Sequence, residues 1–214
     1  MTEKKNTHLQ HIEDQILIDG PKGVKTVINF LTSLTDMVSG SVKEEVIVLT
    51  ERKGIAVTLK WDGSPAVIAG IDPATKKFFV GTKSVFSKGN PKLNFTDKDI
   101  DRNHGGNGDL PNKLKSALKY LPSIWNKGVF QGDMMFDKSI LKRQKIDGKD
   151  SITFKPNTIL YSIPADTDLG KKIAGSKFGI VFHTKYTGQS MEDMSASFNV
   201  TVGDFKQSKD VWFD

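Results

Sequence analysis

The sequence predicts an α+β protein with mainly antiparallel sheets and N-terminal helices. Apolar residues repeat every three or four positions in residues 8–38, which is the period of an amphipathic helix. Later apolar runs are short and rich in β-branched residues, and turn residues separate them, as expected for strands. These strands do not alternate regularly with helices, so a parallel βαβ sheet is not expected.

Two helices are predicted near the N-terminus. The first covers residues 8–18 and the second covers residues 21–38, with Gly20 and Pro21 where they meet. Glycine interrupts a helix, whereas proline suits the first turn of the next one. A strand is predicted over residues 45–49.

The same patterns predict the remaining elements. Strands are expected over residues 54–60, 65–71, 78–83, 128–134, 151–155, 158–163 and 178–183. Helices are expected over residues 110–121, with Asp109 as the N-cap, and over residues 166–174. The segment 87–109 is polar and rich in glycine and asparagine, which predicts a long mobile loop that could serve as a lid.

A chain of 214 residues suits one sizeable domain with a small appendage. We predict an N-terminal helical segment packed on the domain, then a main domain, then a C-terminal extension, over residues 1–44, 45–186 and 187–214.

The composition limits the classes of function. The net charge of +6 favours anionic partners such as nucleotides or nucleic acid. There is no cysteine, which excludes disulfides, thiolate-bound metals and thiol nucleophiles. The first residues are polar and no long apolar run occurs, so we expect no secretory signal, no membrane span and a cytoplasmic location.

The segment Lys60-Trp61-Asp62-Gly63 is the most informative part of the sequence. It stands between two apolar, β-branched runs, a context that predicts a strand, a sharp turn and a second strand. A free lysine has a pKa of about 10.4, so Lys60 must lose a proton before it can act as a nucleophile. Burial and neighbouring cations favour that loss, whereas the carboxylate of Asp62 opposes it unless it is engaged elsewhere.

The chemistry expected of Lys60 is attack on the α-phosphate of a bound nucleoside triphosphate, with pyrophosphate as the leaving group. Mg²⁺ and nearby cations would neutralise the charges that separate in this step. A ribose hydroxyl is the expected partner of Asp62, and Gly63 would let the backbone approach the ligand closely. The same residues also suit a simple hairpin turn, because Asp-Gly is common in such turns.

Two further residues carry open alternatives. Asp133 stands in an otherwise apolar strand, where a carboxylate costs free energy unless it is paired or lies at the edge of a cleft. It is either a metal or ribose contact or an edge residue that faces solvent. His183 ends a predicted strand, and its role is either structural or a contact with phosphate or metal.

Five segments occur in an order that is informative as a set: KWDGSPA, FFVGTKSVFSKG, FQGDMMF, ITFKPNTILYSIP and FGIVFHTKY. They resemble motifs I, Ia, III, IIIa and IV of the covalent nucleotidyltransferase superfamily, which includes ATP-dependent DNA ligases, RNA ligases and mRNA capping enzymes. The serine after the glycine in the first segment is similar to the RNA ligase form. The chain as a whole also resembles an uncharacterised family of T4-like tailed-phage proteins.

The resemblance implies a ligase adenylation type domain and an ATP-dependent, RNA-leaning polynucleotide ligase activity, with RNA or DNA ends as partners and Mg²⁺ as a cofactor. Lys60 would form the covalent AMP adduct, and Asp133 would contact the metal or the ribose. The other positions that the resemblance assigns to nucleotide binding are Thr58, Leu59, Asp62, Gly63, Lys83, Phe154, Lys155, Tyr161 and Lys185.

The chain departs from the family pattern at three places. Phe178 stands where motif IV has a metal-associated glutamate, and Thr58 stands where a glutamate often contacts the base. No clear KxK of motif V follows, and the nearest candidates are Lys185, Lys206 and Lys209. A second hypothesis therefore keeps the fold without the chemistry, as a module that holds nucleotide, nucleic acid or another phage protein. In a third, the chain is a structural or interaction protein and KWDG is only a turn.

Overall fold

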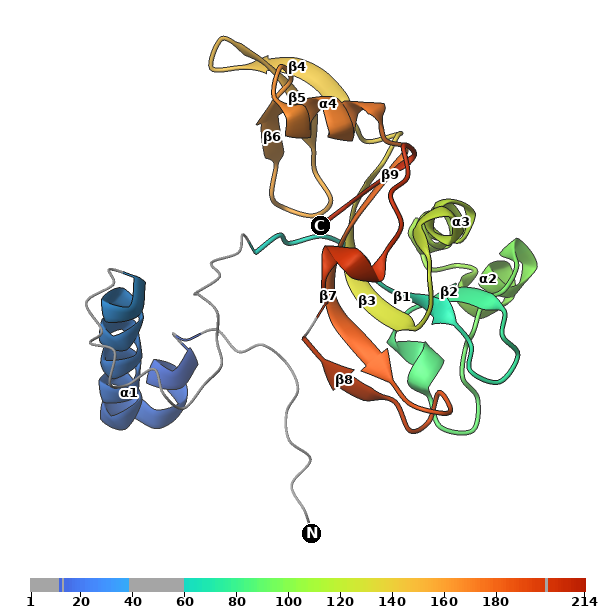
Figure 1. The fold of residues 1–214 in the computed structure, drawn as a ribbon, viewed down its shortest axis with the longest axis horizontal. Helices are drawn as coiled ribbons and strands as arrows, with labels where there is room; N and C mark the ends of the chain where they lie inside the picture. The colour runs from blue at the N-terminus through green and yellow to red at the C-terminus, as the bar shows by residue number, and fades with distance from the viewer. Residues whose placement is uncertain (1–11, 13, 39–59, 199) are drawn as a thin grey trace. The chain divides into compact units, whose positions relative to one another are not determined.

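The computed structural model describes residues 12, 14–38, 60–198 and 200–214 (Figure 1). The chain divides into two compact units, Met1–Lys60 and Trp61–Asp214. The strands predicted over residues 45–49 and before Lys60 lie outside the described residues, as do Thr58 and Leu59.

The first unit contains the helix α1, Asp14–Val38. Gly20 interrupts it with a backbone φ of 54° and ψ of −132°, so two helical segments meet at a kink. This conformation is accessible to glycine because it has no Cβ, and Pro21 then stands in the first turn of the second segment. The predicted break at Gly20 and Pro21 is confirmed. Within the described residues, no helix has the length and apolar character needed to cross a membrane.

The second unit is built on a mixed six-stranded sheet (Figure 1). The strand order is β2-β1-β3-β7-β8, and β9 runs parallel to β7 while every other pair in the sheet is antiparallel. The strands are β1 (Ala66–Ile71), β2 (Phe78–Gly81), β3 (Val129–Asp137), β7 (Phe178–Thr187), β8 (Ser195–Ser197) and β9 (Val211–Phe213). The α+β class with mainly antiparallel pairing is confirmed.

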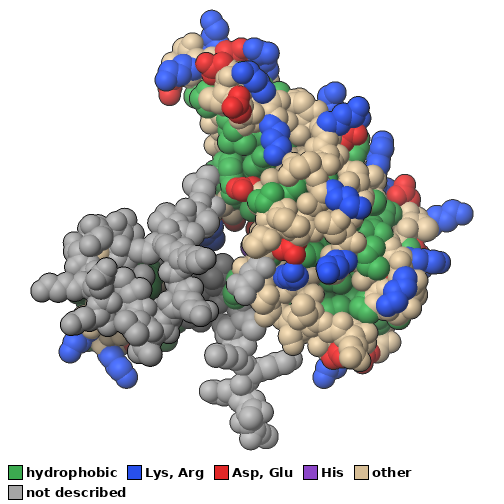
Figure 2. Space-filling view, viewed as in Figure 1, with side chains coloured by type: hydrophobic (Ala, Val, Ile, Leu, Met, Phe, Trp, Pro, Cys, Tyr) green, Lys and Arg blue, Asp and Glu red, His purple; other side chains and the backbone are tan. Residues whose placement is uncertain are grey.

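A second, three-stranded sheet has the order β4-β5-β6 and is antiparallel throughout. Its strands are β4 (Lys142–Ile146), β5 (Lys149–Phe154) and β6 (Tyr161–Pro164), and the helix α4 (Asp168–Gly175) packs against it. The predicted strand pair around Pro156 is β5 with β6. Figure 2 shows charged side chains of both signs gathered over this sheet. The exposed edge strand β4 carries several of them, which discourages pairing with other chains.

Most of the remaining helices of the second unit precede β3 in the sequence. They are the α-helices α2 (Asp97–His104) and α3 (Leu110–Tyr120) and the 3₁₀ helices η2 (Lys83–Phe86) and η3 (Leu121–Ile124), while η4 (Val202–Asp204) comes later. The prediction of a mobile loop over residues 87–109 is wrong, because α2 forms there. Thr96 and Asp99 close a capping box at its start, and Ile100 and His104 are buried.

The helix α3 begins where the sequence predicts it. The expected cap is absent, however: Asp109 has helical backbone angles and its side chain makes no capping hydrogen bond.

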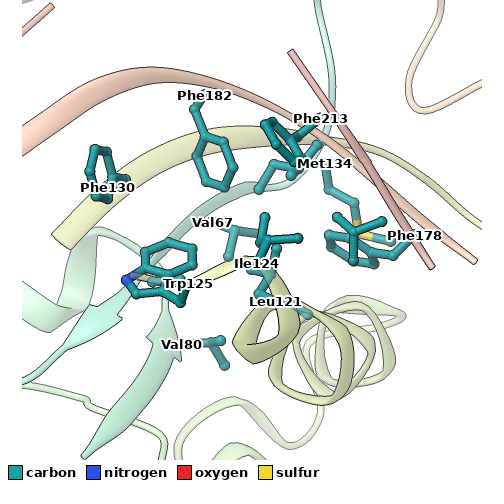
Figure 3. Close-up of a cluster of buried hydrophobic side chains, with 14 of the residues drawn as sticks. Val67, Val80, Leu121, Ile124, Trp125, Phe130, Met134, Phe178, Phe182 and Phe213 are labelled. Carbon is teal, nitrogen blue, oxygen red and sulfur yellow. The ribbon is translucent and has the colours of Figure 1, made fainter. Parts of the chain in front are cut away.

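One face of the six-stranded sheet packs against α3 and η3 (Figure 3). The helical side contributes fully buried side chains from Leu114, Ala117, Leu121 and Ile124. At the centre, the ring of Trp125 lies between 5.1 and 5.7 Å from four other rings, those of Phe78, Phe130, Phe182 and Phe205. Its indole N–H donates to the carbonyl of Gly128 at 3.1 Å, so the polar group of this buried ring is satisfied.

Residues 187–214 take part in the same core. They supply Phe205 and the β9 residues Val211 and Phe213 to it, and the ring of Phe205 stacks on Phe182 at 4.2 Å. The polar composition of this segment gives no indication of these contacts, because only a few of its side chains face inward.

Gly70→Ala should destabilise the sheet. A Cβ at Gly70 would lie 2.4 Å from the carbonyl oxygen of Gly128 and 2.7 Å from the Cα of Val129, both backbone atoms that cannot turn aside. We expect the free energy of unfolding in urea to fall by about 1–3 kcal/mol. Gly175→Ala is the control, since no atom lies within 4 Å of its Cβ. Equal stability of the two variants would contradict the packing of β1 against the start of β3.

Stability should also fall as the pH drops from about 7 to 5, because His104 is buried. Burial, followed by the charge of Lys92, lowers the pKa of His104 below its ordinary value. The unfolded chain therefore binds the proton more readily, so the stability present above pH about 6.5 is lost as the pH falls. Urea unfolding at several pH values should show this decline in the wild type and a shallower one in His104→Gln. An unchanged slope in the variant would rule out this residue as the cause.

Candidate functional site

The segment that follows Lys60 lies along β3. The backbone N–H of Ser64 donates to the carbonyl of Met134 at 2.9 Å, and the N–H of Met134 donates to the carbonyl of Pro65 at 3.0 Å. A Cβ on Gly63 would lie 2.6 Å from the Met134 carbonyl oxygen and 2.9 Å from the Cβ of Asp133. The backbone at Gly63 therefore lies close to the backbone of β3, and its approach to a ligand stays a prediction. Lys60 itself is exposed and is the last residue of the first unit.

The indole of Trp61 is held by three side chains. Its ring centroid lies 5.2 Å from that of Tyr161 and 5.3 Å from that of Trp212. Its N–H donates to Oδ2 of Asp214 at 2.9 Å. Two rings and one charge-assisted hydrogen bond thus fix the residue that follows Lys60.

Asp62 is held by the connection between β5 and β6. Its backbone N–H donates to the hydroxyl of Tyr161 at 2.8 Å, and the amide of Asn157 donates to its backbone oxygen and to Oδ2, both at 3.0 Å. The Asn157 amide is itself fixed, since its oxygen accepts from the backbone N–H of Ile159 at 2.8 Å. The side chain of Asp62 is thereby oriented by the neutral amide of Asn157.

A bulge in β7 decides which side chains join Asp133 on its face of the sheet. Gln131 pairs with Thr184 and Gly132 pairs with Phe182, so His183 is an extra residue in the strand. Residues that pair directly in an antiparallel sheet place their side chains on the same face. Thr184 therefore shares a face with Gln131 and Asp133.

His183 completes a polar group on this face. Its Nε2 lies 3.7 Å from Oδ1 of Asp133, and its Nδ1 lies 2.8 Å from Oγ1 of Thr184. The side chains of Asp133 and His183 are 25% and 34% exposed, whereas Thr184 is buried. The group therefore has two solvent-accessible titratable side chains supported by a buried hydroxyl.

The bulge also sends Lys185 to the opposite face. Lys185 pairs with Phe130, its ammonium lies 5.5 Å from the centre of that ring, and it contacts Asp204 at 2.6 Å. Partial burial raises the pKa of Asp204, but hydrogen bonds from Lys185 and Thr201 outweigh it, so this pKa lies below its ordinary value. Simple alternation along β7 would have placed Lys185 on the face of Asp133.

The other positions expected to bind a nucleotide lie in different settings. Lys83 is exposed at the start of η2, and Lys155 is exposed directly after β5. Phe154 is buried and stacks on Tyr161 at 5.3 Å, so its role as a base contact stays a prediction and would need this ring pair to open. Phe178, at the motif IV glutamate position, is fully buried in the main core.

No pattern in the sequence indicates that Asn157, Trp212 and Asp214 are neighbours of the KWDG segment. Asn157 follows Pro156 and is typical of a turn, and its distance from Asp62 along the sequence does not indicate a contact. Trp212 and Asp214 stand in a polar tail, and the Trp61–Asp214 contact joins residues 153 positions apart. Among the described residues, no group of three or more His, Cys, Asp or Glu side chains is arranged to hold a metal ion.

The chain belongs to a family of unknown function, DUF6267, whose sequence profile matches residues 6–214. No curated protein and no solved structure matched the chain. The family match gives no link to nucleotide transfer.

Tyr161→Phe should loosen the anchor of Asp62. It removes the hydroxyl that accepts from the Asp62 N–H and lies 3.2 Å from the Asp62 carbonyl oxygen. We expect a loss of about 0.5–1.5 kcal/mol in unfolding free energy and faster amide exchange at Asp62. Tyr120→Phe, on α3, is the control and should leave exchange at Asp62 unchanged. Equal exchange in the two variants would contradict the anchor.

Proposed function

We propose that the chain is a covalent nucleotidyltransferase of the polynucleotide ligase type that uses ATP and Mg²⁺. We expect it to prefer RNA to DNA. The observation that carries the proposal is the meeting of three motif-bearing segments at Gly63, Asp133 and Tyr161. Gly63 packs on β3 beside Asp133, and Asp62 is bonded to Tyr161, which is 99 residues away in the sequence. The order of the motifs along the chain does not by itself require this convergence.

The proposed step forms one bond and breaks another. The unprotonated Nζ of Lys60 attacks the α-phosphorus of ATP, and the bond from that phosphorus to the bridging oxygen breaks. The electron pair leaves with pyrophosphate, and the proton lost from the lysine passes to solvent. The product is a lysyl-AMP phosphoramidate on Lys60. Lys60 is joined to Trp61 by one peptide bond, so their Cα atoms are about 3.8 Å apart.

The side chains around the step have distinct proposed roles. Asp62, already oriented by Asn157, would accept from a ribose hydroxyl. Lys83 and Lys155 would supply positive charge to the phosphates. Asp133 fits Mg²⁺, because this ion prefers oxygen ligands and is bound in many sites by one or two carboxylates, water and the substrate phosphates. The ion would neutralise charge on the departing pyrophosphate.

A non-catalytic module that holds a nucleotide or nucleic acid is the second candidate, and two observations favour it. Phe178 is fully buried, so the position of the motif IV glutamate offers no metal ligand. Lys185 is already paired with Asp204. Both features remove charges that the adenylation step uses, while they leave the surface around Asp62 and Asp133 in place.

Covalent labelling tests the first candidate. The protein is incubated with α-labelled ATP and Mg²⁺ and then separated by denaturing electrophoresis. Label should stay with the wild type, be released by acid as expected for a phosphoramidate, and be absent from Lys60→Ala and Lys60→Arg. Lys138→Ala, which removes another exposed lysine, should label like the wild type.

The absence of label with every nucleoside triphosphate would reject the enzymatic proposal. Thermal unfolding with and without ATP then separates the remaining candidates. Stabilisation that grows with ATP concentration, with no label, would support the binding module, since a ligand that binds only the folded state raises its stability by RT ln(1 + [L]/Kd). Neither label nor stabilisation would reject both.

A further inference from the structure

The side chains of Asp133 and His183 lie close together, but no hydrogen bond joins them. The two side chains come from the neighbouring strands β3 and β7. The bulge at His183 brings the hydroxyl of Thr184 beside the imidazole. The distance of 3.7 Å between Nε2 and Oδ1 is too long for a hydrogen bond. Both groups are partly exposed, so a ligand can reach them.

Thr184 explains how the imidazole is oriented. When Nδ1 of His183 donates its proton to Oγ1 of Thr184, at 2.8 Å, Nε2 carries a lone pair. That lone pair and the carboxylate of Asp133 are then two acceptors that face each other. Histidines that bind metals are commonly fixed in this way, by a hydrogen bond from the ring nitrogen that does not bind the metal.

We propose that Asp133 and His183 form a binding site for a divalent transition metal, with Mn²⁺ and Zn²⁺ preferred to Mg²⁺. Bonds of about 2.0–2.2 Å from one ion to each atom span a separation of this size. The imidazole nitrogen gives the preference, because it suits transition metals, whereas Mg²⁺ prefers oxygen. Among the described residues, no third His, Cys, Asp or Glu side chain joins this pair. Water or a ligand phosphate would therefore complete the coordination.

The position of the site gives it a role in the proposed function, although the site itself does not depend on that function. Gly63 packs against β3 beside Asp133, so the ion would lie beside the segment that follows Lys60. It would take the place of the metal contact that Phe178 cannot make. If the chain proves to be a non-catalytic module, the same ion would hold a phosphate without nucleotide transfer.

Metal titration of the full chain, without nucleotide, tests the site. After chelator treatment and dialysis, Mn²⁺ is titrated at pH 7.5 and free Mn²⁺ is followed by electron paramagnetic resonance. We expect one bound Mn²⁺ per chain, displaced by Zn²⁺ at lower concentration than by Mg²⁺. His183→Gln and Asp133→Asn should each weaken binding at least about tenfold, and Thr184→Val should weaken it by about 10–100-fold through loss of the orienting hydroxyl.

Asp137→Asn is the matched control, because Asp137 lies on the same strand and bonds Ser139. It should bind Mn²⁺ like the wild type. A measurement on the wild type avoids variants that fail to fold: Mn²⁺ should broaden the imidazole proton signals of His183 and spare those of buried His104. No binding up to millimolar Mn²⁺, equal binding by His183→Gln and the wild type, or broadening that spares His183 would each overturn the proposal, whatever the labelling assay shows.

Discussion

The contact between Gly63 and β3 is the constraint on which the rest of the site depends. The backbone of residues 63–65 runs against Met134 at a distance that leaves no room for a Cβ. Any other residue at position 63 would force the segment away from β3 and pull Asp62 from Asn157 and Tyr161. The glycine of the motif thus serves the packing of the segment first, and the geometry offered to a ligand follows from that packing.

The bulge at His183 is the second constraint, because it reverses the alternation of β7. Before the bulge, Phe182 faces the main core, and after it, Lys185 faces that same side. The single extra residue therefore replaces Lys185 with Thr184 on the face of Asp133. Lys185 then lies on the opposite side of the sheet, and Nε2 of His183 lies 3.7 Å from the carboxylate of Asp133.

Much of the fold could be predicted from the sequence, because α3 has a regular helical period and β1 is a short apolar run next to turn residues. The start of α2 was missed because its capping residues, Thr96 and Asp99, stand in a stretch whose polar composition resembles a loop. The site could be predicted in part: Asp62, Gly63, Asp133 and Tyr161 are neighbours. The bulge that moves Lys185 to the other face could not be predicted, because an alternating strand pattern does not indicate where one extra residue is inserted. Trp212 and Asp214 could not either, because their contacts with Trp61 depend on the parallel pairing of β9 with β7.

Charge balance decides which lysines are available to an anionic ligand. Moving Lys185 to a phosphate would break its contact with Asp204 and leave that partly buried carboxylate without its cation, which costs free energy. It would also require Lys185 to act across the sheet from Asp133. Residues 61–214 nevertheless contain 23 Lys and Arg against 17 Asp and Glu, so they account for the whole net charge of +6. Exposed lysines such as Lys83 and Lys155 keep this excess in solvent, where it can attract a polyanion without first breaking a buried contact. A ligand held in this way would bind with strong salt dependence, whereas an ion coordinated directly by Asp133 and His183 would depend less on salt.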